Sequence, residues 1–347
     1  MMRGALLVLG VLLVGTARSA SVPVRISVFT LFHPRELVLR SPDARGISLR
    51  SDRETCVLRR HEEARLRATR GSIEVICADQ TIMTALVHIA GADAGAAEIE
   101  LTVPQKIART FRGVADVASS GGELVPIVSM DLETAVASVV SAEQAAPTAF
   151  DALEAQAVAV RSYFVAGHGR HGAFDFCDTT HCQFLKSPPA AAEAAARAVV
   201  ETAGLVLAFR GAPIAALYSA SCGGRTRSLD DAGLAHGGGY PYFSVDCSYC
   251  ARYARQWERR LDADEETTRL IEERSERARL AVGRRHGWST VPGTNFDAVG
   301  PNVIRGRGAG HGIGLCQAGA AALAEDGASF REILAHYYPG TTLTSVN

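Results

Sequence analysis

Two groups of residues near the middle of the chain carry side chains suited to chemistry. The first is a single carboxylate, Glu143, which lies among alanines and follows an apolar, helix-like run at residues 132–140. A carboxyl group in apolar surroundings loses hydration, which raises its pKa and suits it to donate a proton as a general acid. The alternative is a surface glutamate near a helix end, which is the more common situation for this residue type.

The second group combines cysteine and histidine within twelve positions of the chain. Its members are His171, Cys177, His181 and Cys182. Two thiolates with one or two imidazoles are a typical ligand set for tetrahedral zinc, and a structural role is favoured over a catalytic one. The spacing is not that of a standard zinc finger. A Cys177–Cys182 disulfide is therefore the competing interpretation, and a third is that no metal binds and His171 faces solvent.

Two polar loops are candidates to line a cleft. Ser219 and Ser221 precede a Cys-Gly-Gly segment but do not form the G-x-S-x-G pattern of a hydrolase nucleophile. Residues 308–317 are glycine-rich but lack the lysine of a phosphate-binding loop. Glycine allows the backbone to approach a ligand closely. We therefore expect His311, with glycine on both sides, to be exposed and to contact a ligand.

The elements that must position these residues begin with short strands. Alternating apolar residues and intervening turns predict β-strands at residues 22–32, 46–49, 56–58, 72–77 and 98–103. We interpret residues 21–122 as a small β-rich N-terminal region. A last strand at 125–130 leads into the helices.

Helical patterns dominate the rest of the chain. We predict helices at residues 132–140, 149–165, 190–203, 262–280, 317–324 and 330–337, and a hairpin formed by 204–209 and 213–218. Within the charged 262–280 helix, Leu270 and Ile271 are expected to face inward. The fold class predicted is α+β, with mixed sheets and helices forming a catalytic cleft in a domain at residues 123–347.

Composition and the N-terminus narrow the functional class. The formal net charge of -1 gives no support for binding to nucleic acid. Residues 1–20 have a positive start, a short apolar stretch and small residues at the end, as in a signal peptide. An uncleaved membrane anchor is the alternative, although the apolar stretch is shorter than the ~20 residues that span a bilayer. We expect a protein that is secreted, periplasmic or in the cell envelope, with no membrane span after cleavage.

Export changes how the eight cysteines are interpreted, because an oxidising compartment favours disulfides. Cys56 and Cys77 could link two strands of the N-terminal region or be two independent buried thiols. The remaining four, Cys222, Cys247, Cys250 and Cys316, could form a zinc site or two disulfides. Four cysteines allow three pairings, and their spacing does not choose among them.

Four blocks of the sequence resemble the stage II sporulation protein D/LytB amidase-enhancer family, called SpoIID below. They are L-E-T-A-V-A-S-V-V-S-A-E at 132–143, L-E-A-Q-A-V-A-V-R-S-Y at 153–163, F-D-F-C-D-T-T-H-C-Q at 174–183 and G-H-G-I-G-L-C-Q-A-G-A at 310–320. The H-Y-Y-P-G segment at 336–340 also matches. Together these blocks are far more specific than any one alone, and the resemblance extends between residues 111 and 343.

The resemblance implies a cell-wall function. Sporulation members of the family are lytic transglycosylases that cut peptidoglycan between N-acetylmuramic acid and N-acetylglucosamine, whereas LytB-type members are described as modifiers of amidases. The family's catalytic glutamate falls on Glu143, and some members hold zinc in the region of His171, Cys177 and Cys182. Six residues are candidates to hold sugar amide and hydroxyl groups: Gln156, Arg161, Ser219, Ser221, His311 and Gln317. Arg161 is equally interpretable as a structural pairing residue.

The chain also departs from the family pattern. Cys316 replaces a family serine, and Cys222 also stands in a loop of the candidate cleft. This coincidence favours a Cys222–Cys316 disulfide, which would leave Cys247 with Cys250. The family's Glu-Met-Pro turn is displaced here to Pro147, which affects how Glu143 is positioned.

Three functional hypotheses follow. The leading one is an exported lytic transglycosylase acting on peptidoglycan glycan strands. The second is a non-catalytic wall-binding protein that stimulates an N-acetylmuramoyl-L-alanine amidase. The third, a zinc hydrolase of amide bonds, is disfavoured because no His-Glu-x-x-His helix is present.

Overall fold

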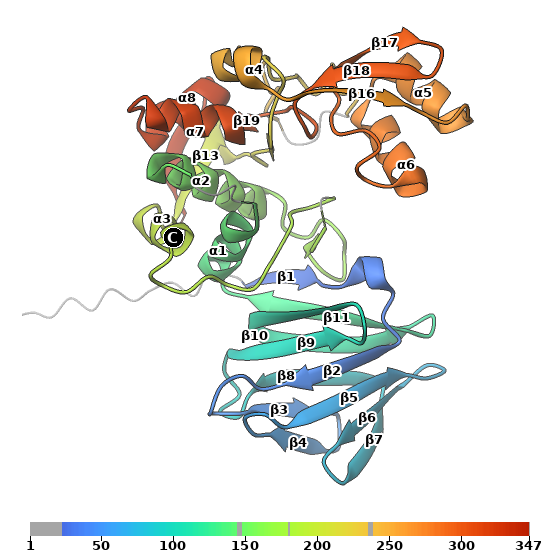
Figure 1. Ribbon diagram of the computed structural model, residues 1–347. Coiled ribbons are helices and arrows are strands. Elements are labelled where there is room, and N and C mark those ends of the chain that lie inside the picture. The colour runs from blue at the N-terminus through green and yellow to red at the C-terminus, as the bar shows by residue number, and fades with distance from the viewer. Residues whose placement is uncertain (1–22, 144–147, 180, 235–238, 347) are drawn as a thin grey trace, which may run out of the picture.

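The computed structural model describes residues 23–143, 148–179, 181–234 and 239–346 (Figure 1). The fold is α+β: a strand-rich N-terminal part stacks against a helical part, and a small unit of three strands and two helices lies beside the helices (Figure 1). The predicted signal peptide and Pro147 lie outside the described residues. Among the described helices, none combines the length and apolar composition needed to cross a membrane.

The N-terminal part is one branched sheet. Its strands are β1 (Val24–Ser27), β2 (Glu36–Arg40), β3 (Ile47–Arg50), β4 (Thr55–Leu58), β5 (Glu63–Ala68), β6 (Ile73–Cys77), β7 (Gln80–Thr84), β8 (Leu86–Gly91), β9 (Ala97–Val103), β10 (Ile107–Ser120), β11 (Glu123–Met130) and β12 (Phe176–Cys177). The main order is β12-β1-β11-β10-β9-β2-β5-β6-β7, and β8 joins β10 to β3 and β4. The predicted strand at 22–32 ends earlier, and a 3₁₀ turn at Thr30–Phe32 follows β1.

The long strand β10 connects the branches of this sheet. Its first half pairs with β9, and its second half pairs with both β11 and β8. Every second residue of β11 is buried, as expected for a strand with one face on a core. Since β11 pairs with β1 and β10, the sheet continues to Met130, past the predicted domain boundary at residue 122.

A disulfide crosslinks the sheet. Cys56 of β4 and Cys77 of β6 are bonded to each other, although their strands are not neighbours in the sheet. The bond therefore ties the β3–β4 branch to the main path, and the two residues are not independent thiols.

The helical part is built around one buried helix, α2 (Phe150–Ala166). Around it lie α1 (Leu132–Glu143), α3 (Ala194–Glu201), α7 (Gln317–Glu325), α8 (Phe330–Tyr337) and the strand β13 (Leu205–Phe209). Residues 152–164 of α2 are all buried, and a helix buried on every side is typical of a domain centre. Its alanines allow these neighbours to pack closely.

The remaining elements belong to the helical part and to the small unit beside it. Strand β13 pairs with β14 (Ala212–Pro213) and β20 (Thr342–Ser345), β15 (Tyr218–Ser219) pairs in parallel with β19 (Leu315–Cys316), and α4 (Ser248–Tyr253) packs on α7. The small unit contains β16 (Gln256–Arg260), β17 (Phe296–Gly300), β18 (Val303–Arg307), α5 (Glu265–Glu273) and α6 (Glu276–His286). The predicted hairpin is thus only partly formed, since β14 ends at Pro213 and Tyr218 pairs elsewhere.

The prediction of a single helix at 262–280 was wrong, because this segment contains α5 and the beginning of α6. Arg274 adopts a left-handed conformation that ends α5, and the Ser275 side chain accepts a hydrogen bond from the Ala278 backbone to begin α6. Leu270 is fully buried as predicted, whereas Ile271 is partly buried.

A buried ion pair fixes α1 on α2. Arg161 is 0% exposed, and its guanidinium donates to Glu133 of α1 at 2.6–3.1 Å and to the carbonyl oxygens of Leu205 and Val199 at 3.1 and 3.2 Å. A side chain so enclosed does not reach a sugar. The predicted substrate-binding role of Arg161 is therefore corrected to the structural role that was its alternative.

We predict that Arg161→Met lowers the free energy of unfolding by about 3 kcal/mol, because breaking a buried pair leaves Glu133 without its counter-charge. Adding Glu133→Leu should restore much of the loss. Urea denaturation followed by circular dichroism measures both effects. The matched control is Arg197→Met, since Arg197 and Glu201 form an exposed pair at 3.9 Å that contributes little. An equal cost for the two arginine substitutions would contradict the assignment.

Candidate functional site

Glu143 is the last residue of α1 and is half-buried. Burial raises the pKa of its carboxyl group above the ordinary glutamate value. Hydrogen bonds from the Phe184 backbone and the Gln317 side chain, with the charge of Lys186, partly offset this rise. The carboxyl is therefore not in bulk solvent, and no described residue forms a direct ion pair with it, which is the environment of a group able to donate and recover a proton.

The glycine-rich block meets Glu143 through Gln317. The Gln317 side-chain amide donates to the Glu143 backbone oxygen at 3.4 Å, across 174 positions of the chain. The preceding glycine, Gly314, has a positive φ of 66°, and a Cβ there would overlap the Leu217 carbonyl oxygen. Only glycine permits this close approach, which places Gln317 at the beginning of α7 against the end of α1.

Tyr218 is a site residue that the sequence analysis missed. Its hydroxyl donates to the Gln183 side chain at 2.7 Å. Burial, and then the nearby Glu143 charge, raise the pKa of Tyr218 well above its usual range, so the phenol stays protonated. Gln183 belongs to the same sequence block (174–183) as most of the Cys/His group, so this contact joins that block to the surroundings of Glu143. Its only sequence signal was a position next to Ser219.

His311 braces the glycine-rich loop. Its Nδ1 accepts a hydrogen bond from the Ile313 backbone at 3.0 Å, and its ring also hydrogen-bonds to the Tyr218 backbone. Burial lowers the pKa of the imidazole, which favours the neutral ring. The residue is partly buried rather than exposed as predicted, because the backbone around it folds over the ring. Through these contacts His311 orients the loop.

Among the described residues, two predicted contact residues have polar atoms without a partner. The side-chain amide of Gln156 and the hydroxyl of Ser219 are buried and unpaired, and each residue is 6% exposed. Buried polar groups are normally hydrogen-bonded, so both can accept water or a ligand. The Ser221 hydroxyl instead lies 3.3 Å from the Cys250 sulfur and faces the cysteine cluster.

The four residues of the Cys/His group do converge. Their ligand atoms, from His171, Cys177, His181 and Cys182, all lie within 4.8 Å of one another. The two sulfurs are 3.4 Å apart, and sulfur–nitrogen distances in the group are 3.2, 3.6 and 3.7 Å. A zinc tetrahedron with the usual bond lengths has edges of about 3.8 Å between sulfurs and about 3.6 Å between sulfur and nitrogen. These residues fit a tetrahedral metal ion, and His181 completes the three-residue set implied by the resemblance.

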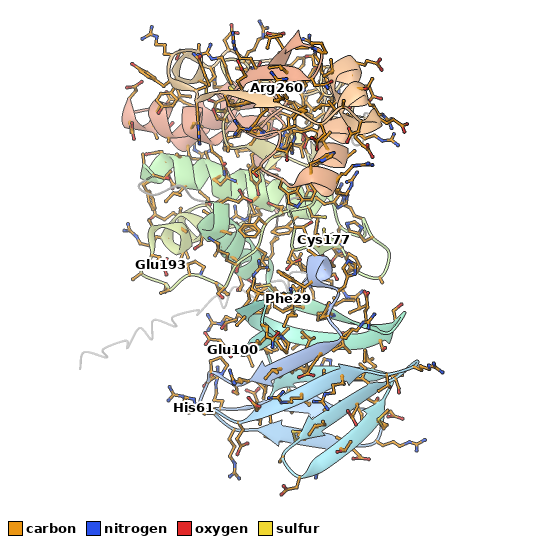
Figure 2. The ribbon with its side chains drawn as sticks, turned by 45° about the vertical axis from the view of Figure 1, so that its right-hand side comes forward. Phe29, His61, Glu100, Cys177, Glu193 and Arg260 are labelled. Atoms are coloured by element: carbon orange, nitrogen blue, oxygen red, sulfur yellow. A yellow bond between two sulfur atoms is a disulfide. The ribbon has the colours of Figure 1, made fainter. Side chains whose placement is uncertain are left out.

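This Cys/His group is held against the edge of the sheet. Strand β12 pairs in parallel with β1, and Figure 2 shows Cys177 and Phe29 at the junction of the sheet and the helices. The buried Asp178 carboxylate accepts from the Phe29 backbone and from Arg109, both at 2.9 Å. Asp175 accepts from the Arg25 backbone at 2.9 Å. Both aspartates therefore position the loop and are not ligands.

The predicted pairings Cys222–Cys316 and Cys247–Cys250 are not formed. All four residues are buried free thiols. Their sulfurs converge on one point instead of facing one another in two pairs. Cys177 and Cys182 are likewise unbonded.

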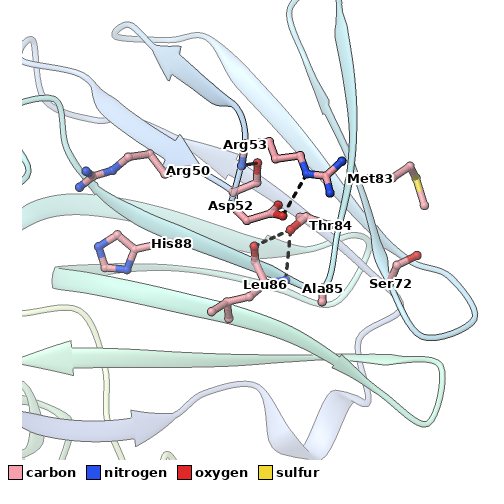
Figure 3. Close-up of a pocket in the computed structure, with 10 residues that line it drawn as sticks. Arg50, Asp52, Arg53, Ser72, Met83, Thr84, Ala85, Leu86 and His88 are labelled. Atoms are coloured by element: carbon pink, nitrogen blue, oxygen red, sulfur yellow. Dashed lines mark hydrogen bonds and ion pairs between the residues drawn. The ribbon is translucent and has the colours of Figure 1, made fainter.

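A separate hollow of about 890 Å³ lies in the N-terminal sheet (Figure 3). Arg53 pairs there with Asp52 at 3.4 Å, and the Thr84 hydroxyl donates to the Leu86 backbone at 2.9 Å. Neither contact resembles the half-buried carboxyl environment of Glu143, so the hollow is not a candidate for the same chemistry.

Comparison with known proteins places this site in a family context. Residues 120–209 match the SpoIID family, described as stage II sporulation protein. The chain is 27% identical over 258 residues to an uncharacterized protein of Brachyspira hyodysenteriae, a match that covers 65% of this chain and 69% of that protein. It is 64% identical over 43 residues to the amidase enhancer of Bacillus subtilis, which is 12% of this chain and 6% of that protein.

The matched segment contains α1, α2 and the Cys/His group, and so includes Glu143. Residues 120–209 of this chain are thus similar to the SpoIID family, and a stretch of 43 residues is similar to the amidase enhancer of Bacillus subtilis.

Proposed function

We propose that this protein is an exported lytic transglycosylase that cleaves the glycan strands of peptidoglycan. The observation that carries the proposal is the environment of Glu143: a half-buried carboxyl with a raised pKa, next to Gln317 and Tyr218. The related SpoIID segment supports peptidoglycan as the substrate. The cell envelope, outside the cytoplasm, is the location that this substrate requires.

One carboxyl group performs both proton transfers in this mechanism. Protonated Glu143 donates to the glycosidic oxygen between N-acetylmuramic acid and N-acetylglucosamine, and the bond from the anomeric carbon to that oxygen breaks. The muramyl 6-hydroxyl then attacks the same anomeric carbon, and its proton returns to the Glu143 carboxylate. The products are a free N-acetylglucosamine 4-hydroxyl and a 1,6-anhydro sugar, with no water consumed. A glycosidase that hydrolyses the bond requires a second carboxylate.

Other residues of the site bind and orient the sugar in this proposal. The unpaired polar atoms of Gln156 and Ser219 are themselves buried, so in this proposal they hydrogen-bond to amide or hydroxyl groups of the glycan through bridging water. Gln317 has its side chain at Glu143 and holds the carboxyl in place. Ser221, His311 and Arg161 contact other parts of the protein and do not bind the sugar in this proposal.

Zinc has a structural role in the proposal. His171, Cys177, His181 and Cys182 would hold the ion with four protein ligands, which leaves no open coordination position for catalysis. The ion would fix the loop that ends at Gln183. Through its contact with the Tyr218 hydroxyl, Gln183 then helps to shape the surroundings of Glu143.

The alternative is a wall-binding protein that stimulates an N-acetylmuramoyl-L-alanine amidase. It is favoured by the similarity to the amidase enhancer of Bacillus subtilis. The two functions differ in what Glu143 does: stimulation of an amidase needs no proton donor, so it should survive loss of the carboxyl.

We predict that Glu143→Gln lowers the rate of anhydro-product formation from denuded glycan strands by at least about 100-fold, because the amide cannot donate the required proton. Mass spectrometry of the released muropeptides measures the product. Glu325→Gln, at an exposed glutamate at the end of α7, is the matched control and should retain full activity. Equal rates for wild type and Glu143→Gln would remove Glu143 from its role. Stimulation of an added amidase by both proteins, without anhydro product, would favour the alternative.

The pH dependence of kcat/KM should reflect the same group. Since the acid acts when protonated, kcat/KM is predicted to fall as the pH rises through the pKa of Glu143, which lies above the ordinary glutamate value. The hydrogen bond from Gln317 stabilises the carboxylate, so Gln317→Leu should raise that pKa further and move the falling limb to higher pH. The readout is the position of the limb and not its height. A limb that stays in place or moves to lower pH would contradict the assignment.

We predict that Cys182→Ser lowers the bound zinc by one ion per chain and lowers the Tm, because one ligand of the closed site is lost. Elemental analysis and thermal unfolding measure the two effects. His168→Ala is the control: its ring pairs with Asp175 at 2.5 Å in the same loop and is not in the cluster, so zinc should be retained. A disulfide between Cys177 and Cys182 in a non-reducing peptide map would contradict the site.

A further inference from the structure

A second cluster of possible ligands lies away from the Cys/His group and consists only of cysteine. Its members come from three distant segments: Cys222 follows β15, Cys247 and Cys250 begin α4, and Cys316 is the N-cap of α7. All four are at most 3% exposed. Their sulfur atoms all lie within 4.8 Å of one another.

We propose that these four cysteines bind a second structural metal ion, a zinc-class ion held by four thiolates. The sulfurs of Cys250 and Cys316 are 3.5 Å apart, close to the edge of about 3.8 Å expected for a tetrahedron with zinc–sulfur bonds of about 2.3 Å. A disulfide would bring two sulfurs to about 2.05 Å. Each thiol releases its proton to solvent as it binds the ion.

The arrangement of the four residues favours one shared ion over two disulfides. Cys247 and Cys250 have the C-x-x-C spacing with which zinc ribbons present two sulfurs to one metal ion. Cys316 and Cys222 bring their sulfurs to the same point from two other segments, and no pair among the four is bonded. Zinc is preferred over harder ions because thiolate ligands select soft or borderline metals.

Hydrogen-bond donors surround the sulfurs as they do around metal-bound thiolates. The Cys316 sulfur accepts from the backbones of Cys222 and Gly319 at 3.3 and 3.4 Å. The Tyr337 hydroxyl lies 3.5 Å from the Cys247 sulfur, and the Ser221 hydroxyl lies beside Cys250. Such outer contacts orient the ligands and stabilise their negative charge.

The space for the cluster depends on a glycine. A Cβ at Gly319 would overlap both the Tyr337 hydroxyl and the Cys247 sulfur. Gly319 lies in the first turn of α7, where a larger residue would be compatible with the helix itself. Glycine at this position therefore leaves the space that the cysteine cluster occupies.

The metal ion would hold together three segments of the chain near the candidate site. It joins the segment after β15, the beginning of α4 and the beginning of α7 in one centre. Cys316 directly precedes Gln317, the residue that contacts Glu143. The metal assignment itself is independent of the reaction that Glu143 performs, because it rests on the cysteine geometry alone.

Metal analysis of the purified full-length chain tests the proposal. A Cys177→Ser/Cys182→Ser variant lacks the Cys/His site, and it should still contain one zinc ion per chain. Reconstitution of this variant with Co²⁺ should give intense thiolate-to-cobalt charge transfer. Cys250→His in the same background should retain the ion, with that charge-transfer absorption reduced by about a quarter as one of four thiolates is replaced.

Two results would overturn the proposal. One is the absence of bound zinc in Cys177→Ser/Cys182→Ser protein that is folded by circular dichroism. The other is a non-reducing peptide map of this variant in which Cys222, Cys247, Cys250 and Cys316 are joined in disulfides. Because the first variant keeps all four cysteines, a failure of Cys250→His to fold leaves the zinc measurement decisive.

Discussion

The helical half of this protein depends on one charge that has no access to water. Arg161 is enclosed in the middle of α2, and a buried guanidinium is tolerated only when it is paired and hydrogen-bonded. Glu133 supplies the counter-charge from the beginning of α1, and two backbone carbonyl oxygens accept the remaining hydrogen bonds of the guanidinium. The pair fixes the start of α1 on α2, and the rigid helix then carries Glu143 at its other end to Gln317. The position of the proposed acid is therefore a consequence of an ion pair three turns away.

Much of this arrangement could be predicted from local pattern. Period-two alternation indicated β-strands at 98–103 and 125–130, and apolar helical runs indicated α1 and α2, because these signals depend on neighbours in sequence. The Cys/His group was found from its residue types, whereas the role of Glu143 was predicted from the resemblance to the SpoIID family, because local pattern alone favoured a surface glutamate. The break at Arg274 was missed because a non-glycine residue in the left-handed region leaves no clear signal in composition.

Contacts between segments that are distant in sequence could not be predicted from local sequence pattern. Sequence left Arg161 open between a substrate contact and a structural pair until its burial was known. The contact of Tyr218 with Gln183 could not be predicted, because the two residues are 35 positions apart. His311 was expected to be exposed from its glycine neighbours, yet those glycines let the backbone fold around the ring. The cysteines show the same limit. Their number and spacing allowed several pairings, and only the fold brings four sulfurs to a single point.

The pairing of β12 with β1 has a consequence for the whole molecule. An open sheet edge presents unpaired amide and carbonyl groups to which strands of other molecules can add. Here β12, a two-residue segment from the helical half, pairs with Ile26 and Ser27 of β1, so a very short strand forms this edge and offers few backbone groups for intermolecular addition. The same contact makes the N-terminal sheet a clamp for the loop of the Cys/His group. Loosening of the sheet would therefore also disorder that loop. The same short stretch of backbone thus affects both the edge of the sheet and the integrity of the site.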